Sequence, residues 1–224
     1  MGAAASIIDR LARDGMYRGA MDSRDDWEGT LAELGEVVGR ERIMLHVTSR
    51  NLHSTDAISF HTDSPIADLV AWYCVRQDPD GGATSFLDLG ALGQVLDPET
   101  FEDLRLVRHR CPSQRRARLV DVPLLLDEGT AARPRFFFTP WLIDPGLDQR
   151  ALAAYRAFVE ALAEHEEEWV QQVRLERGEV VIIDNRRILH ARRELPAHSP
   201  RLLERAWIST TPRYRALLGD DADS

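Results

Sequence analysis

Strand-like segments recur along most of the chain, and they constrain the fold more than any other feature of the sequence. The clearest is the apolar run Glu179–Asp184, which follows the turn residues Arg177-Gly178. Further strands are expected over residues 43–47, 58–63, 69–76, 118–126, 135–140 and 202–210. Strands distributed in this way exclude a helical bundle. They predict a mainly β fold, a double-stranded β-helix (jelly roll, cupin-like) core with helical buttresses.

Two helical regions are expected beside the strands. Near the start of the chain, Ser23 can cap a helix over Asp25–Val38, and a shorter helix over residues 6–12 precedes it. Asp148 can cap a longer helix that reaches about His165. The predicted buried face of that helix consists of Leu152, Tyr155, Val159 and Leu162. Two short helices are expected after the N-cap candidates Asp88 and Asp97.

Length and charge limit the classes of protein that remain. The 224 residues are enough for one well-filled domain, so we expect a single domain over 1–224, with 219–224 as a mobile acidic tail. The 28 basic and 37 acidic residues give a net charge of −9, which argues against a nucleic-acid-binding protein. Two cysteines and no long apolar run predict a cytoplasmic protein that does not span a membrane.

Three residues stand out as candidate metal ligands. His61 and Asp63 lie on a predicted strand, where side chains two positions apart point to the same side. His190 follows the apolar strand 179–184 and the polar turn after it, and is the candidate third ligand. Two imidazoles and one carboxylate leave coordination positions open, which suits non-heme Fe(II) binding an oxo acid and O₂ together.

Two arginines follow the third candidate ligand. Arg201 and Arg205 lie on a predicted strand at positions that share one face. An inward guanidinium is costly unless an anion meets it, and its fork of donors matches a carboxylate. The sequence therefore predicts an anionic co-substrate near the metal.

Four sequence blocks resemble the Fe(II)/2-oxoglutarate-dependent dioxygenases of the taurine dioxygenase and clavaminate synthase-like group. They are His61-Thr62-Asp63, Gly81-Gly82-Ala83-Thr84, the stretch from Asp184-Asn185-Arg186 to His190-Ala191-Arg192, and Arg201-x-x-x-Arg205. They occur in the order found in that group, and the resemblance spans roughly residues 40–212. The third block is closer to the clavaminate synthase side of the group than to taurine dioxygenase itself.

The resemblance implies a role for each motif residue. His61, Asp63 and His190 would bind iron, and Thr84 with Arg201 would hold the distal carboxylate of 2-oxoglutarate. Arg205 matches a position that often binds an anionic group of the substrate. Asn51 and His53, just before the His61 strand, are expected to line the substrate pocket.

The implied activity is oxidative decarboxylation of 2-oxoglutarate coupled to C–H oxidation, with Fe(II) as cofactor and 2-oxoglutarate and O₂ as co-substrates. Hydroxylation of a small carboxylate-bearing, amino-acid-like metabolite, in bacterial specialised metabolism, is the expected outcome. Halogenation is disfavoured, because halogenating relatives have lost the carboxylate that Asp63 retains. The chain is short for the group, so trimmed N-terminal and lid regions are expected.

Three other functions stay open from the sequence. The first is the same chemistry on a substrate tethered to a carrier protein, which would dock at the basic run Arg105–Arg118; the alternative is that this run is a solvated face. The second is a non-catalytic metal-binding jelly-roll protein, against which the intact Arg201 argues. The third is a zinc hydrolase, which would lack an evident general base and leave Arg201 unexplained.

Overall fold

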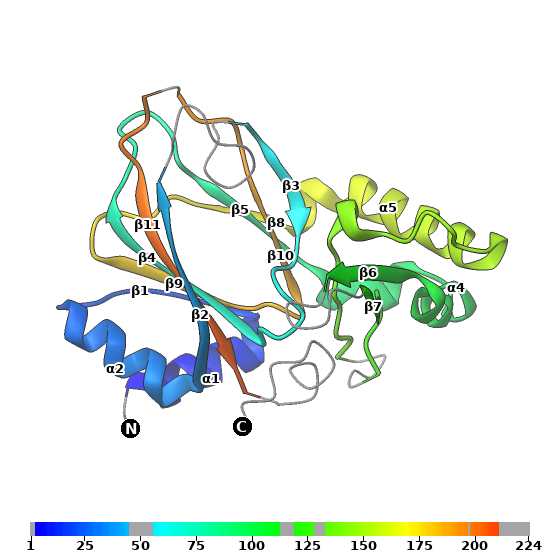
Figure 1. Ribbon diagram of the computed structural model, residues 1–224, viewed down its shortest axis with the longest axis horizontal. Helices are drawn as coiled ribbons and strands as arrows, with labels where there is room; N and C mark the ends of the chain where they lie inside the picture. Colours follow the sequence, from blue (N-terminus) through cyan, green and yellow to red (C-terminus); the bar gives the residue numbers. More distant parts are fainter. Residues whose placement is uncertain (1–2, 45–55, 113–118, 128–132, 197, 211–224) are drawn as a thin grey trace.

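Two antiparallel sheets that face each other form the core of the protein (Figure 1). The computed structural model describes residues 3–44, 56–112, 119–127, 133–196 and 198–210. The larger sheet has the strand order β1-β9-β4-β11-β2, and the smaller has the order β3-β10-β5-β8. Because sequence-distant strands alternate across both sheets, the arrangement is a jelly roll, and the predicted fold class is confirmed.

The strands predicted over 69–76, 179–184 and 202–210 are observed with nearly the same bounds, whereas β1, β5, β6, β8 and β10 were not predicted. The strand predicted over 43–47 begins earlier, at Glu36, and residues 45–47 lie outside the described part of the chain. The strands of the larger sheet are β1 (Met16–Ala20), β9 (Glu179–Asp184), β4 (Leu69–Arg76), β11 (Leu202–Ser209) and β2 (Glu36–Met44). Those of the smaller sheet are β3 (Ile58–His61), β10 (Ile188–Arg192), β5 (Thr84–Asp88) and β8 (Val170–Val173), while β6 (Arg108–Pro112) pairs with β7 (Leu119–Pro123). The helices are α1 (Ala3–Asp14), α2 (Arg24–Leu34), α3 (Leu92–Val95), α4 (Pro98–Asp103) and α5 (Gln149–Trp169). Short 3₁₀ turns are η2 (Leu89–Ala91), η3 (Leu104–Leu106) and η4 (Pro140–Leu142).

The predicted helix over Asp25–Val38 is too long. Ser23 caps it as expected, its hydroxyl accepting the N–H of Asp26, but α2 ends at Leu34. Gly35 follows, and a Cβ there would lie 2.8 Å from the carbonyl oxygen of Ser209 at the end of β11. The close approach of β11 explains why the chain leaves the helix here, so that Val38 lies in β2 rather than in the helix.

Three predicted strands are shorter than expected or absent. The strand predicted over 118–126 covers only Leu119–Pro123. The strand predicted over 58–63 ends at His61, so Asp63 lies beyond it. The segment 135–140 is not a strand: it makes a single β-bridge, between Phe136 and Leu125, before η4 begins. Its backbone instead bonds to loops, because Phe136 N–H donates to Arg186 O and Phe138 O accepts the N–H of Thr62.

Strand alternation sends one set of side chains into the space between the sheets. In β9, Val181 and Ile183 face this space, while Val180 and Ile182 face outward. The smaller sheet contributes Phe86 and Ile188 to the same inner cluster. His190 shares the inward side with Ile188, since the two lie two positions apart on β10.

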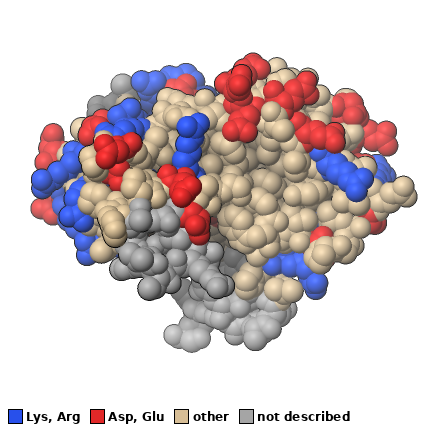
Figure 2. All heavy atoms as spheres, turned by 90° about the horizontal axis from the view of Figure 1, so that it is seen from above, with Lys and Arg blue, Asp and Glu red and all other residues tan. Residues whose placement is uncertain are grey.

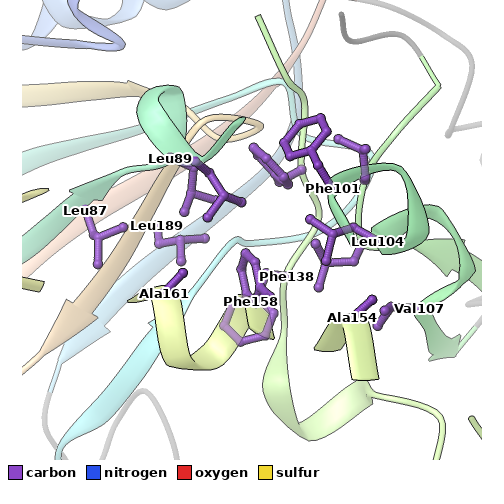
Figure 3. Packing of buried hydrophobic residues seen from close by; sticks show 14 residues of the cluster. Leu87, Leu89, Phe101, Leu104, Val107, Phe138, Ala154, Phe158, Ala161 and Leu189 are labelled. Atoms are coloured by element: carbon purple, nitrogen blue, oxygen red, sulfur yellow. The ribbon is translucent and has the colours of Figure 1, made fainter. Parts of the chain in front are cut away.

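Helices cover the outer faces of both sheets. α1 and α2 pack on the larger sheet through Ile7, Leu11, Trp27 and Leu31, which join the outward residues of β4, β9 and β11. α5 lies against the smaller sheet and the 136–138 segment, with Phe158 close to Phe138 and Ala161 towards Leu189 (Figure 3). The helices therefore act as the expected buttresses.

The buried face of α5 is rotated from the predicted one. Ala151, Ala154, Phe158 and Ala161 are its buried residues. Leu152, Tyr155 and Leu162 lie only partly buried beside them, and Val159 is 41% exposed. Small alanines let the helix approach the sheet closely, and this face is less apolar in sequence than the one expected.

On the face shown in Figure 2, acidic and basic side chains are interspersed, with no continuous basic stripe. Among the described residues, no helix combines the length and apolarity that crossing a membrane would require.

Substitution within α5 tests this packing. Phe158→Ala removes a fully buried ring and is expected to lower the free energy of unfolding by about 3–5 kcal/mol. The adjacent exposed Val159→Ala is expected to change it by less than about 1 kcal/mol. Denaturant titration of both variants measures the difference. A larger loss of unfolding free energy for Val159→Ala than for Phe158→Ala would show that α5 buries the face that contains Val159.

Candidate metal centre

The two candidate histidines meet across a strand pair. β10 pairs with β3 in an antiparallel register that places His190 directly opposite His61. Their ring centroids lie 4.3 Å apart, and both residues are buried. The register, rather than proximity in sequence, brings the two imidazoles together between the sheets.

Asp63 reaches the histidines from the loop after β3. The backbone N–H of Asp63 donates to Asn185 Oδ1 at 2.9 Å, and Asn185 Nδ2 donates to Ala67 O at 2.9 Å. Thr62 is fixed to Phe138, whose N–H donates to Thr62 Oγ1 at 2.9 Å. These loop contacts turn the carboxylate towards the histidines, so the predicted convergence is correct although its strand-alternation argument is wrong.

The three side chains form a compact donor set. One ligand atom each from His61, Asp63 and His190 lies within 4.8 Å of the others. His61 Nδ1 lies 2.8 Å from Ser59 O. Because a carbonyl only accepts, Nδ1 carries the proton, and Nε2 presents its lone pair towards Asp63 Oδ1 at 3.8 Å.

The protonation states of His61 and Asp63 suit the binding of a cation. Burial, and then the neighbouring His190, lowers the pKa of His61 to about 3, so its ring is neutral. Burial alone would raise the pKa of Asp63, but the charge of Arg205 holds it well below its usual range. A neutral imidazole, as in His61, and an ionised carboxylate, as in Asp63, are the forms that bind a metal.

The buried ring nitrogens of His190 support the presence of a metal site. Among the described residues, neither ring nitrogen of buried His190 has a hydrogen-bond partner, and its Nε2 lies 3.6 Å from Asp63 Oδ1. Buried polar atoms are normally satisfied. Two nitrogens and one oxygen converging on one side fit Fe(II) and leave other coordination positions open.

A second feature is the buried cation Arg201. Its side chain is in contact with Thr84, Nη2 donating to Oγ1 at 3.1 Å. Burial, and then the nearby charge of Arg192, lowers the pKa of Arg201 to about 10. Within the described ranges no carboxylate forms an ion pair with it, and its Nε has no hydrogen-bond partner. An uncompensated buried guanidinium is costly unless an anion meets it.

The predicted Gly81-Gly82-Ala83-Thr84 block has a structural reason. Gly82 has φ 81°, a left-handed conformation that favours glycine. A Cβ at Gly82 would lie 2.1 Å from Gln77 Oε1 and 3.3 Å from Arg201 Cδ. The glycine therefore leaves room for the Arg201 side chain to lie beside Thr84.

The two candidate histidine ligands and the buried Arg201 line the same cavity. It lies between the sheets and is lined by Ile43, Ile58, His61, Trp72, Thr84, His190, Ala191, Arg192, Arg201, Leu203 and Arg205. The predicted site residues from four separate sequence blocks are thus brought together.

Arg205 lies in this cavity but has partners within the protein. Its Nη1 donates to both oxygens of Asp63, each at 3.0 Å, and its Nη2 donates to Glu41. The expected role of Arg205 in binding a substrate anion stays a prediction. Asn51 and His53, the other expected substrate-pocket residues, lie outside the described residues.

The described part of the basic run Arg105–Arg118, residues 105–112, alternates between buried and more exposed residues. Arg105 pairs with Glu102 and Asp127, and Arg110 is exposed, whereas the intervening His109 and Cys111 are buried. Residues 113–118 of the run lie outside the described part of the chain. The described portion is consistent with the solvated-face interpretation.

Sequence reasoning missed several residues that shape the site. Asn185 orients the loop of Asp63, and its place in the Asp184-Asn185-Arg186 block was the only available signal. Trp207 Nε1 donates to Asp63 Oδ2 at 2.8 Å, and the rings of Trp72 and His190 pack edge to face with their centroids 4.9 Å apart. No local pattern marks these tryptophans, because they depend on the packing of the larger sheet.

A jelly roll with two histidines and a carboxylate between its sheets, beside a buried arginine, defines the class of non-heme iron oxygenases. The sequence matches the family model "Taurine catabolism dioxygenase TauD, TfdA family" over residues 28–207. The chain belongs to this family, and it is therefore an Fe(II)- and 2-oxoglutarate-dependent oxygenase. A search of curated protein sequences found no match.

Solved structures share the fold. A mutant of the non-heme iron oxygenase OrfP in complex with (3S)-hydroxy-L-Arg is 21% identical, with a TM-score of 0.76, covering 96% of this chain and 82% of that one. OrfP with Fe and alpha-ketoglutaric acid is 20% identical, with a TM-score of 0.74 and coverage of 95% and 80%. Asparagine oxygenase in complex with Fe(II), 2S,3S-3-hydroxyasparagine and succinate is 19% identical, with a TM-score of 0.73 and coverage of 95% and 81%.

The buried His109 generates a pH prediction. Its Nε2 accepts the N–H of Thr139, next to the segment that fixes Thr62, and burial lowers its pKa to about 4. The unfolded chain therefore binds a proton near pH 6.5 that the folded protein does not take up until about pH 4. Stability from this residue is fully present above about pH 6.5 and is lost as the pH falls towards about 4.

His109→Gln tests this linkage. The fall in unfolding free energy of the metal-free protein between about pH 7 and about pH 5 is expected to be smaller in the variant, by roughly 2 kcal/mol. Denaturant titrations of both proteins at the two pH values measure it, and contributions of the other histidines cancel. Identical pH dependence would mean that His109 titrates normally in the folded protein.

Proposed function

We propose that the chain oxidises a C–H bond of a small, free, carboxylate-bearing, amino-acid-like metabolite, with hydroxylation as the outcome. The observation that carries the proposal is the compact donor set of His61, Asp63 and His190 beside the buried Arg201, which has no carboxylate partner among the described residues. OrfP and asparagine oxygenase, which share the fold, were each solved with a hydroxylated amino acid. A role in bacterial specialised metabolism is part of the proposal.

Each site residue has a proposed part. His61 Nε2, His190 Nε2 and a carboxylate oxygen of Asp63 hold Fe(II). Thr84 and Arg201 bind the distal carboxylate of 2-oxoglutarate, through a hydroxyl donor and a guanidinium fork. Bound iron, with 2-oxoglutarate and O₂, supplies the C–H oxidation, in which the oxo acid becomes succinate and CO₂ and one oxygen atom enters the substrate.

The protein's own contribution is positioning and exclusion of water. Ser59 O fixes the tautomer and orientation of His61. Trp72 packs its ring against His190, and Ile43 and Leu203 line the same cavity. A buried, largely apolar wall around the charged groups strengthens their electrostatic interactions with the oxo acid.

Arg201 also bears on the competing functions. A metal-storage or sensor protein with the same three ligands has no need of a buried guanidinium without a carboxylate partner. A zinc hydrolase would leave the same charge unexplained. Neither of these alternatives gains support from another residue of the cavity, and no comparison supports a carrier-protein partner.

The proposed cofactor roles are tested by anaerobic absorption spectroscopy. Fe(II) followed by 2-oxoglutarate is expected to give the visible charge-transfer band of the iron–oxo acid chelate. His190→Ala is expected to abolish the band. Arg201→Gln should weaken 2-oxoglutarate binding by about 10- to 100-fold, since a charged hydrogen-bonding group is lost.

Arg193→Gln is the control, because Arg193 is an exposed arginine that directly follows β10. It is expected to leave the dissociation constant of 2-oxoglutarate unchanged. A folded, iron-loaded protein that gives no band would contradict the proposed function. With the band established, free amino acids are screened for substrate-dependent succinate formation. Failure of every amino acid-like compound would remove the proposed substrate class.

A further inference from the structure

We propose that Trp207 is a positioning residue for the metal, whose indole N–H holds one oxygen of Asp63 and leaves the other to coordinate. The inference rests on the proposed function in one respect, namely that Asp63 is a metal ligand. It goes further by assigning Oδ1 as the ligating atom and by giving Trp207, which none of the sequence blocks includes, a role at the centre.

The two carboxylate oxygens of Asp63 have different surroundings. Oδ1 faces the histidines, 3.8 Å from His61 Nε2 and 3.6 Å from His190 Nε2. Oδ2 accepts the indole N–H of Trp207 at 2.8 Å. Arg205 Nη1 lies 3.0 Å from both oxygens and so does not distinguish between them. Among the described residues, the indole is thus the hydrogen-bond donor that makes the two oxygens inequivalent.

This inequivalence has a consequence for coordination. A lone pair of Oδ2 that accepts a hydrogen bond is less available to a cation, whereas Oδ1 keeps its free side towards the two imidazoles. Binding through one oxygen occupies one coordination position rather than two. More positions then remain for a chelating oxo acid and O₂.

Trp207 is itself held by the strands on either side of it. It lies on β11 opposite Gly39 of β2, and a Cβ at Gly39 would come within 2.6 Å of Trp207 Cε3. The guanidinium carbon of Arg205 lies 4.5 Å from the centroid of the indole. Arg205 in turn is the cross-strand partner of Glu41 and is ion-paired with it. The indole is therefore fixed before any metal binds.

The test compares two identical substitutions. Trp207→Phe keeps an aromatic ring but removes the N–H donor to Asp63. Trp27→Phe is the matched control: Trp27 is buried on α2, and its Nε1 has no hydrogen-bond partner among the described residues. Both variants lose an indole N–H, but only one of them loses a contact to a candidate ligand.

Co(II) is the probe, because its visible absorption bands report both affinity and coordination geometry. Trp207→Phe is expected to bind Co(II) about 10- to 100-fold more weakly than the wild type, with altered bands. Trp27→Phe is expected to bind Co(II) as the wild type does. Thermal unfolding of the metal-free proteins shows whether both variants are folded.

Gly39→Ala provides a second variant that leaves the tryptophan in place. The added methyl group must displace the indole, so Co(II) binding is expected to weaken in the same direction as for Trp207→Phe. Equal Co(II) affinity and spectra in folded Trp207→Phe, Trp27→Phe and the wild type would overturn the inference. Failure of the wild type to bind Co(II) at all would instead contradict the proposed function.

Discussion

The antiparallel register of β10 and β3 is the constraint on which the site depends. It places His190 opposite His61, and the same strand β10 also pairs with β5. A shift of this register by one residue would turn His190 outward, into the cluster under α5, and bring Leu189 between the sheets. The helices on both outer faces therefore act on the metal centre indirectly, by burying the outward residues that fix the register.

Buried arginines give the space between the sheets its chemical character. Arg186 is ion-paired with Asp68, and Arg205 with Asp63 and Glu41, so each of these charges is compensated within the protein. Arg201 is equally buried, yet within the described residues it has only a hydroxyl partner, Thr84. Because an unpaired buried charge is destabilising, this contrast marks Arg201 as available to an anionic ligand.

Much of the fold was predictable because its signals are local. The strand Glu179–Asp184, the cap residues Ser23, Asp97 and Asp148, and the jelly-roll class could be predicted from apolar runs and capping chemistry. The end of α2 could not, because it is set by the approach of β11 to Gly35, a contact between distant parts of the chain. The buried face of α5 could not be predicted for a similar reason, because close packing on the sheet favours alanines over larger apolar residues.

The candidate site likewise contains residues that motifs identify and residues that only the folded structure reveals. His61, Asp63, His190, Thr84 and Arg201 could be selected from motifs, but the motifs did not explain how Asp63 is oriented. That orientation depends on Asn185, Thr62 and Trp207, which reach it from a turn, its own loop and a neighbouring sheet. Such contacts between elements distant in sequence have no periodic or spacing signal, so only the assembled sheets reveal them.

The central claim is that these residues form one centre for iron and 2-oxoglutarate. Anomalous diffraction at the iron edge, from crystals grown anaerobically with Fe(II) and 2-oxoglutarate, tests it most directly. We expect a single strong peak bound by His61 Nε2, His190 Nε2 and Asp63 Oδ1, with the distal carboxylate of the oxo acid on Arg201 and Thr84. Iron bound elsewhere, or an oxo acid that does not contact Arg201, would contradict this account.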